Sequence, residues 1–270
     1  MNIIADMHVH VYPAHSLPVF FEMAAANFRR IAAVAGGECA CVLALAERRD
    51  MNFFEDIVSG RIAIPTGWQA RACASGCAIE MRRGNFESLY FVSGRQIVTS
   101  DRLEVLALGT RHAFPDGMET QDAICRVIEA GAGAAVLPWG AGKWMGRRGR
   151  IVENAIRRFG PSSLWLGDSS LRPAFLPLPA QMRKGNAEGF RLAAGSDPLP
   201  ISGEERWVAA YASLWREADD AGDPAETFLR LLSDPAGKPK AIGKRCSLLS
   251  FLRRVVRYEA AGRGRGRAAG

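Results

Sequence analysis

The chain opens with the stretch Ile3-Ile4-Ala5-Asp6-Met7-His8-Val9-His10, in which an apolar run gives way to alternating polar side chains. A short apolar run of this kind is typical of a buried strand, and a helical pattern follows it over residues 18 to about 34. Side chains two residues apart on a strand point to the same face. We therefore expect a strand followed by a helix, with Asp6, His8 and His10 together on one face of the strand's end.

The same alternation of apolar runs and helical patterns continues along the chain. Five more core strands are expected at residues 39–46, 103–108, 134–139, 163–168 and 190–197, and a seventh strand is expected near 62–70. Helices are expected at 53–58, 120–130, 150–159, 204–218 and 224–233. Such alternation indicates a parallel sheet with crossover connections. Polar residues at the strand ends favour a parallel (β/α) barrel, including a distorted or seven-stranded one, over an open doubly wound sheet.

The region from about 70 to 102 breaks this pattern. Its extended runs are separated by turn signals at 83–85 and 93–95, which predicts an antiparallel β insertion. We expect a single α/β barrel domain over residues 1–260. Residues 261–270 contain only Gly, Arg and Ala, a composition that predicts a disordered Arg/Gly tail.

Composition places the chain among globular proteins. It has 270 residues, of which 48% are hydrophobic and 23% charged, and no apolar run is long enough to span a membrane. The first residues lack the basic start of a signal peptide, so we expect a cytoplasmic protein whose six cysteines stay reduced. The net charge of +7 permits binding of nucleic acid or of an acidic substrate without demonstrating either.

Acids and imidazoles gather at the expected strand ends, where parallel α/β proteins bind their ligands. His8 and His10 can chelate one divalent cation, and Asp6 and Asp197 are the carboxylates expected to support it. A chance His-x-His pair is the alternative. It is the less favoured one, because the chain has only four histidines.

Two short motifs carry a family resemblance. Asp6-Met-His8-Val-His10, at the end of the first strand, resembles the opening motif of the amidohydrolase superfamily and of the polymerase and histidinol phosphatase (PHP) family. Gly195-Ser196-Asp197-Pro198 is similar to the aspartate-bearing last strand of the amidohydrolases. The resemblance implies a distorted barrel, one to three divalent ions (Zn, Mn or Fe) and hydrolysis by a metal-activated water. The sequence lacks several of the histidines of these families.

Three residues are candidates for catalysis. Asp197 is the preferred proton acceptor and Asp168 the second choice, although Asp168 also suits a helix cap or turn. His112 fits either a third ligand or a general acid, and an ordinary loop histidine is equally compatible. His15 lies in a proline-bracketed loop near the same end. Glu47 is interpreted as a surface acid beside two arginines.

A glycine-bracketed basic run, residues 139–150, joins an expected strand to an expected helix. Free backbone N–H groups and a helix N-terminus favour anions, so Lys143 and Arg147 are candidates to bind an anionic substrate group, together with Arg111. A solvated basic turn is the alternative interpretation.

These observations favour a metal-dependent hydrolase of a small anionic substrate such as a phosphoester. Two other hypotheses stay open. One is a catalytically degenerate barrel that binds a ligand or a protein. The other is a nucleic-acid-associated protein, which the charge and the Arg/Gly tail permit but which no motif of the core supports.

Overall fold

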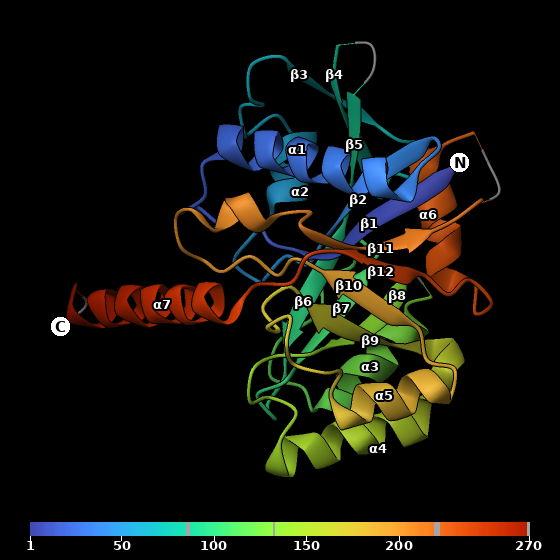
Figure 1. The fold of residues 1–270 in the computed structure, drawn as a ribbon, viewed down its shortest axis with the longest axis vertical. Helices are drawn as coiled ribbons and strands as arrows, with labels where there is room; N and C mark the ends of the chain where they lie inside the picture. The colour runs from blue at the N-terminus through green and yellow to red at the C-terminus, as the bar shows by residue number, and fades with distance from the viewer. Residues whose placement is uncertain (85–86, 132, 219–221, 269–270) are drawn as a thin grey trace.

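The computed structural model describes residues 1–84, 87–131, 133–218 and 222–268, with side chains described as far as residue 261. Two mixed β-sheets occupy the centre, and helices lie outside them (Figure 1). None of the described helices is both long and apolar enough to cross a membrane.

The first sheet has seven strands in the order β12-β11-β1-β2-β5-β4-β3. In this sheet β1, β2 and β5 run parallel, while β11 and β12 continue one edge, and β4 and β3 the other, in antiparallel fashion. The strands are β1 (Asn2–Val9), β2 (Cys39–Leu45), β3 (Trp68–Ala72), β4 (Ala78–Arg83), β5 (Glu87–Val92), β11 (Tyr211–Trp215) and β12 (Lys240–Gly243).

The second sheet has five strands in the order β10-β9-β8-β7-β6. Here β8, β9 and β10 run parallel, whereas β7 is antiparallel to both of its neighbours. The strands are β6 (Gly94–Val98), β7 (Glu104–Leu108), β8 (Ala134–Pro138), β9 (Leu164–Ser169) and β10 (Leu192–Gly195).

The hydrophobic core has three parts that follow this layering. One lies between α1 and the outer face of the seven-stranded sheet, where Phe20, Phe21, Ala24, Phe28 and Ile31 recur at helical spacing and are buried. The second fills the space between the sheets, and the third lies under α3, α4 and α5. The helices are α1 (Leu17–Ala35), α2 (Phe53–Val58), α3 (Thr120–Glu129), α4 (Gly146–Ser163), α5 (Ala180–Ala187), η1 (Glu204–Trp207), α6 (Pro224–Ser233) and α7 (Leu248–Ala268).

The expectation of a closed parallel barrel is wrong, although the α/β class holds. A closed barrel needs β1 to pair on one side with the last core strand. Instead β11 pairs with that edge of β1, and β5 pairs with the free edge of β2. Both edges are occupied, so the sheets stay open. Backbone bonds between them are scattered, such as Asp197 N–H to the His8 carbonyl (2.9 Å) and Glu47 N–H to the Gly94 carbonyl (3.1 Å).

The helix expected over residues 204–218 is also wrong. The short helix η1 occupies its start, and the rest forms β11. Tyr211 and Trp215 are aromatic residues that favour strands, and all five residues of β11 are buried. A strand buried on both faces shows no alternation, which is why the sequence pattern was misleading here.

The antiparallel β3–β4–β5 meander lies where extended hairpins were expected, and β5 then joins the parallel part of its sheet. Helix α7 extends away from the body of the molecule (Figure 1) and runs to Ala268, through most of the segment for which disorder is predicted. The last two residues lie outside the described part of the chain. The division into a domain over 1–260 and a disordered tail stays a prediction.

Candidate metal centre

Three predicted residues meet where the two sheets approach each other. The Nε2 atoms of His8 and His10 are 3.0 Å apart, and Oδ1 of Asp197 lies 3.7 Å from the first and 3.8 Å from the second. The side chains of His8 and His10 are 6% and 4% exposed, whereas the side chain of Asp197 is 21% exposed. The cluster is therefore closed on the histidine side and reached by solvent on the aspartate side.

The close approach of β10 to β1 places Asp197 beside the histidines. A Cβ on Gly195 would lie 2.5 Å from the backbone nitrogen of His8, so only glycine fits at this contact. After Gly195 the chain turns sharply, and Asp197 has a positive φ of 50°. Its backbone N–H donates to the carbonyl of His8 at 2.9 Å. This bond holds the aspartate next to the end of β1.

Asp6 does not belong to the cluster but binds the backbone segments that carry it. Its side chain is fully buried, and its two oxygens accept backbone N–H bonds from Ser196 (2.8 Å), Ala209 (2.8 Å) and His8 (3.3 Å). Burial raises the pKa of Asp6 to about 6, and these hydrogen bonds limit the rise. Asp6 thereby ties both ends of the 196–209 segment to β1.

The charges of the site favour a neutral His10 imidazole beside an ionised Asp197 carboxylate. Burial, reinforced by the neighbouring His8, lowers the pKa of His10 to about 3. Burial on its own raises the pKa of Asp197, but His8, His10 and Lys143 outweigh it and lower that pKa. Neutral imidazole and carboxylate are the forms in which these side chains bind a metal.

The geometry fits a divalent cation. The circle through the three ligand atoms has a radius of about 2 Å, which matches zinc–nitrogen and zinc–oxygen bonds of about 2.0–2.2 Å. Two ring nitrogens 3.0 Å apart need a proton or a cation between them, because their lone pairs otherwise repel each other. Within the described part of the chain, this trio forms the one cluster of metal-binding side chains.

Asp168 lies at the end of the neighbouring strand β9 but has other partners. Arg172 donates to both of its oxygens, at 2.7 Å and 2.6 Å, and the Tyr211 hydroxyl donates at 2.7 Å. The carboxylate is 4% exposed and does not belong to the cluster.

Other predicted residues lie apart from the cluster. Arg111 forms a bidentate pair with Glu55, at 2.8 Å and 2.9 Å. His112 is exposed and contacts Phe114, while Arg147 is exposed at the start of α4. Their functional roles stay predictions.

Lys143 and Glu47 complete the predicted set. The Lys143 ammonium pairs with Glu104 at 2.6 Å, and its charge acts on Asp197. The interpretation of Glu47 as a surface acid is wrong, because the residue is 5% exposed and accepts the backbone N–H of Phe54 at 2.9 Å. The two arginines that follow Glu47 in the sequence suggested a surface position, whereas its carboxylate is bound to the backbone of α2.

Sequence reasoning did not identify Ser169 and Tyr12 as residues that support the cluster, whereas it placed His15 near this end of the strand. The Ser169 hydroxyl donates to Oδ2 of Asp197 at 3.1 Å, which leaves Oδ1 facing the imidazoles. The Tyr12 ring stacks on His10 at 5.2 Å, and His15 lies against Tyr12 with Nε2 2.9 Å from the Leu199 carbonyl. The sequence offered one signal for Tyr12: it lies two residues after His10, the spacing at which side chains of an extended chain share a face.

Comparison with known proteins gives a fold likeness. No family model and no curated protein sequence matches the chain. Among solved structures, PsfC from Pseudomonas syringae PB-5123 matches with a TM-score of 0.55 and 13% identity, over 97% of this chain and 98% of that one. The lesion-specific endonuclease PfuEndoQ from Pyrococcus furiosus matches with a TM-score of 0.51 and 11% identity, over 89% of this chain and 58% of that one.

At these identities the likeness concerns the fold alone. The expected resemblance to the amidohydrolase superfamily and the PHP family is contradicted by these findings. The chain matches no family model, and its two open sheets replace the closed barrel that the resemblance implied.

Proposed function

We propose that the protein is a metal-dependent hydrolase of phosphoesters. The observation that carries this proposal is the cluster of His8, His10 and Asp197, whose three ligand atoms surround a point at metal-bond distance. Three protein ligands are typical of catalytic sites, which keep one position open for water or substrate. The partial exposure of Asp197 supplies that opening.

A divalent ion bound there would act as a Lewis acid and would lower the pKa of a water molecule toward neutrality. His8 and His10 would hold it through Nε2, and Asp197 through Oδ1. Oδ2 of Asp197 accepts the Ser169 hydroxyl and lies on the same carboxylate, so it is placed to receive a proton from an attacking water. The Lys143 ammonium would orient the anionic group of the substrate.

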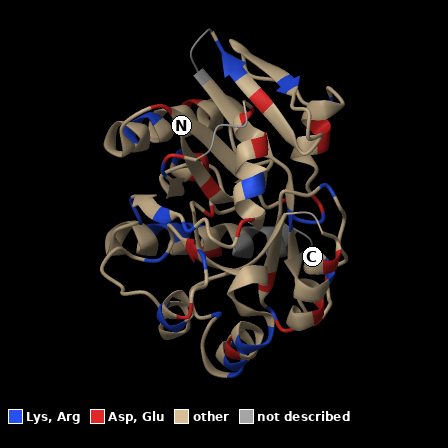
Figure 2. Ribbon diagram, turned by 90° about the vertical axis from the view of Figure 1, so that its right-hand side faces the viewer, with Lys and Arg blue, Asp and Glu red and all other residues tan. Residues whose placement is uncertain are grey.

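Nucleic acid is the second candidate substrate. It is favoured by one observation, the fold likeness to a lesion-specific endonuclease. A nucleic acid is itself a phosphoester, so the same cluster would serve. On the face shown in Figure 2, however, basic and acidic residues are interspersed, whereas a duplex favours a continuous basic surface.

The test is a metal analysis followed by a substrate panel. Purified protein is loaded separately with Zn²⁺, Mn²⁺ and Fe²⁺, and the bound ion per chain is measured by elemental analysis. Each form is then assayed with p-nitrophenyl phosphate, bis-p-nitrophenyl phosphate and oligonucleotides with intact or damaged bases. Hydrolysis of the small esters alone supports the first candidate, and cleavage of oligonucleotides alone supports the second. If the metal-loaded protein hydrolyses no substrate of the panel, the proposal is overturned and a binding module is the remaining interpretation.

A further inference from the structure

A second concave site lies away from the metal centre, on the outer side of α1. It is a cavity of about 980 Å³ between α1, the η1 segment, the end of β12 and α7. Binding sites for organic ligands usually measure about 300–1,000 Å³, so this cavity is large enough to hold one. None of the three residues of the metal cluster lines it.

One part of the cavity wall is apolar. Ile31 and Val34 contribute from α1, Trp207 from η1 and Ile242 from β12. Val34 is 76% exposed, so its side chain is accessible to a ligand. The wall therefore offers an apolar surface to a ligand.

The other part of the wall is cationic. Arg30, Arg206, Lys244 and Arg257 all line the cavity, and none of them has a carboxylate partner within the described residues. Arg30 donates to the side chain of Asn27, and Arg257 donates to the carbonyl of Ser202. Both of these partners are neutral, and the four cations therefore have no ion-pair partner among the described residues.

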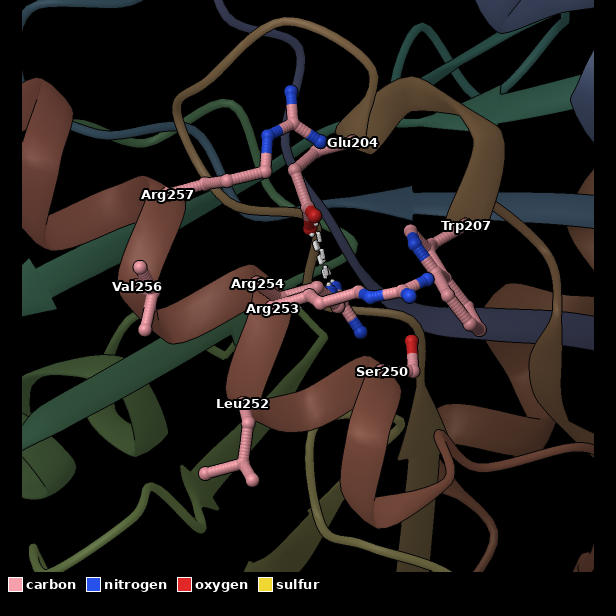
Figure 3. A pocket seen from close by; sticks show the side chains of 8 residues that line it. All are labelled: Glu204, Trp207, Ser250, Leu252, Arg253, Arg254, Val256 and Arg257. Atoms are coloured by element: carbon pink, nitrogen blue, oxygen red, sulfur yellow. Dashed lines mark hydrogen bonds and ion pairs between the residues drawn. The ribbon is translucent and has the colours of Figure 1, made fainter.

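The two acids directly before Arg206 in the sequence have other partners. Glu204 is 1% exposed and accepts Nε and Nη2 of Arg254 at 2.6–3.0 Å, and the Arg254 guanidinium also lies over the Trp207 ring at 4.7 Å (Figure 3). Glu205 is 4% exposed and accepts the backbone N–H of Gly203 at 2.7 Å. Neither carboxylate forms an ion pair with a cation of the cavity.

Four like charges around one apolar hollow repel one another, and an anion placed among them relieves that repulsion. We propose that this cavity binds an anionic amphiphile: an aromatic or aliphatic body that packs on Ile31, Val34 and Trp207 and carries a sulfonate, phosphate or carboxylate among the cations. This site is independent of the hydrolase proposal, because it shares no residue with the metal cluster.

Two probes that differ only by their anionic group test the site. The first is 8-anilino-1-naphthalenesulfonate, and the second is N-phenyl-1-naphthylamine, which has the same rings without the sulfonate. Each is titrated into the wild-type protein and followed by fluorescence. We expect saturable binding of the sulfonate at one site per chain. We expect the uncharged probe to bind about tenfold more weakly or worse, since it gains nothing from the cations.

The variant Arg206→Glu with Lys244→Glu reverses two of the charges. It should weaken binding of the sulfonate by about tenfold or more and leave binding of the uncharged probe within about twofold. Both side chains are exposed, so the fold should survive, which a thermal melt checks. The milder variant Arg206→Gln with Lys244→Gln should weaken sulfonate binding by a smaller factor of about three and serves if the reversal unfolds the chain.

The matched control is Arg49→Glu with Arg183→Glu, which changes the net charge equally at two exposed positions outside the cavity. It should leave the affinity for the sulfonate within about twofold of the wild type. If both charge-reversed variants bind the sulfonate equally weakly, the effect depends on net charge alone and the proposal is overturned. Equal affinity of the wild type for both probes, or unsaturable binding of the sulfonate, would overturn it as well.

Discussion

Asp168 and Asp197 stand at the ends of two neighbouring parallel strands and have opposite environments. Asp168 is held on both oxygens by Arg172 and by the hydroxyl of Tyr211. Asp197 faces two imidazoles and keeps a path to solvent. In the sequence both are aspartates that follow an apolar run and a glycine within two residues.

The difference teaches that the partner, and not the strand end, decides what a buried carboxylate does. Arg172 lies four residues after Asp168 and neutralises it, so the pair joins β9 to the turn that follows. At Asp197 no arginine or lysine of the described residues lies within ion-pair distance, and Oδ1 faces the two histidines. A cation can therefore bind at Asp197 and has no vacant oxygen to bind at Asp168.

The largest expected effect is on metal content. Replacing His8→Ala together with His10→Ala removes two of three ligands, so bound metal should fall from about one ion per chain to almost none. His112→Ala, at an exposed histidine outside the cluster, is the matched control and should keep its metal. Elemental analysis of both, after identical loading and desalting, makes the comparison. Retention of the ion by the double histidine variant would place the metal site elsewhere.

The second effect is on rate. Asp197→Asn should lower kcat by about two to four orders of magnitude, the usual contribution of general acid–base catalysis. Asparagine is the suitable replacement, because it tolerates the positive φ of this position better than most residues. The melting temperature should stay within a few degrees of the wild type. Full activity would remove Asp197 from the mechanism, and a collapsed melt would make it a structural residue.

The local pattern of apolar residues predicted the strands that carry Asp168, Asp197 and the two histidines. The apolar periodicity of α1 and the apolar runs of β1, β9 and β10 were predicted close to their observed bounds, because each signal lies within one segment. The pairing Asp6-x-His8-x-His10 likewise depends on a single strand. The approach of Asp197 to the histidines was expected from its place on a late strand.

The rest depends on contacts that are distant in sequence. No local signal indicates that β11 would occupy the edge of β1, so the open sheets were not foreseen. The same holds for Tyr211 and Asp168, which are 43 residues apart and meet only because β11 lies where it does. The Glu47 burial depends on α2 folding over it.

The third prediction concerns stability at Asp168. Asp168→Asn leaves Arg172, whose side chain is 4% exposed, as an unpaired buried charge, and this should lower the free energy of unfolding by about 3–5 kcal/mol. Combining it with Arg172→Met removes the orphaned charge and should restore part of the loss. Urea unfolding measures both. If Asp168→Asn is as stable as the wild type, the Asp168–Arg172 ion pair does not stabilise the fold, and Asp168 does not differ from Asp197 in the way argued above.

Glu47, a third buried carboxylate, extends the comparison to the end of β2 with the smallest expected effect. Burial raises its pKa to about 7 from an ordinary 4.5, and the backbone N–H of Phe54 and the Arg95 guanidinium offset only part of that rise. The unfolded chain therefore releases this proton near pH 4.5 and the folded chain only near pH 7. The contribution of Glu47 to the free energy of unfolding is therefore fully present below pH 4.5, is lost as the pH rises to 7, and does not change further above pH 7.

Glu47→Gln cannot titrate and still offers an oxygen to the backbone N–H of Phe54. The free energy of unfolding of this variant, relative to the wild type, should therefore increase by about 3 kcal/mol or less between pH 4.5 and 7. The measurement is a series of urea unfolding curves from pH 4.5 to 8, with Glu129→Gln, an exposed residue at the end of α3, as the control that should track the wild type. Parallel pH profiles for the wild type and Glu47→Gln would show that Glu47 is solvated in solution, and the environment of the third carboxylate would then resemble neither of the other two.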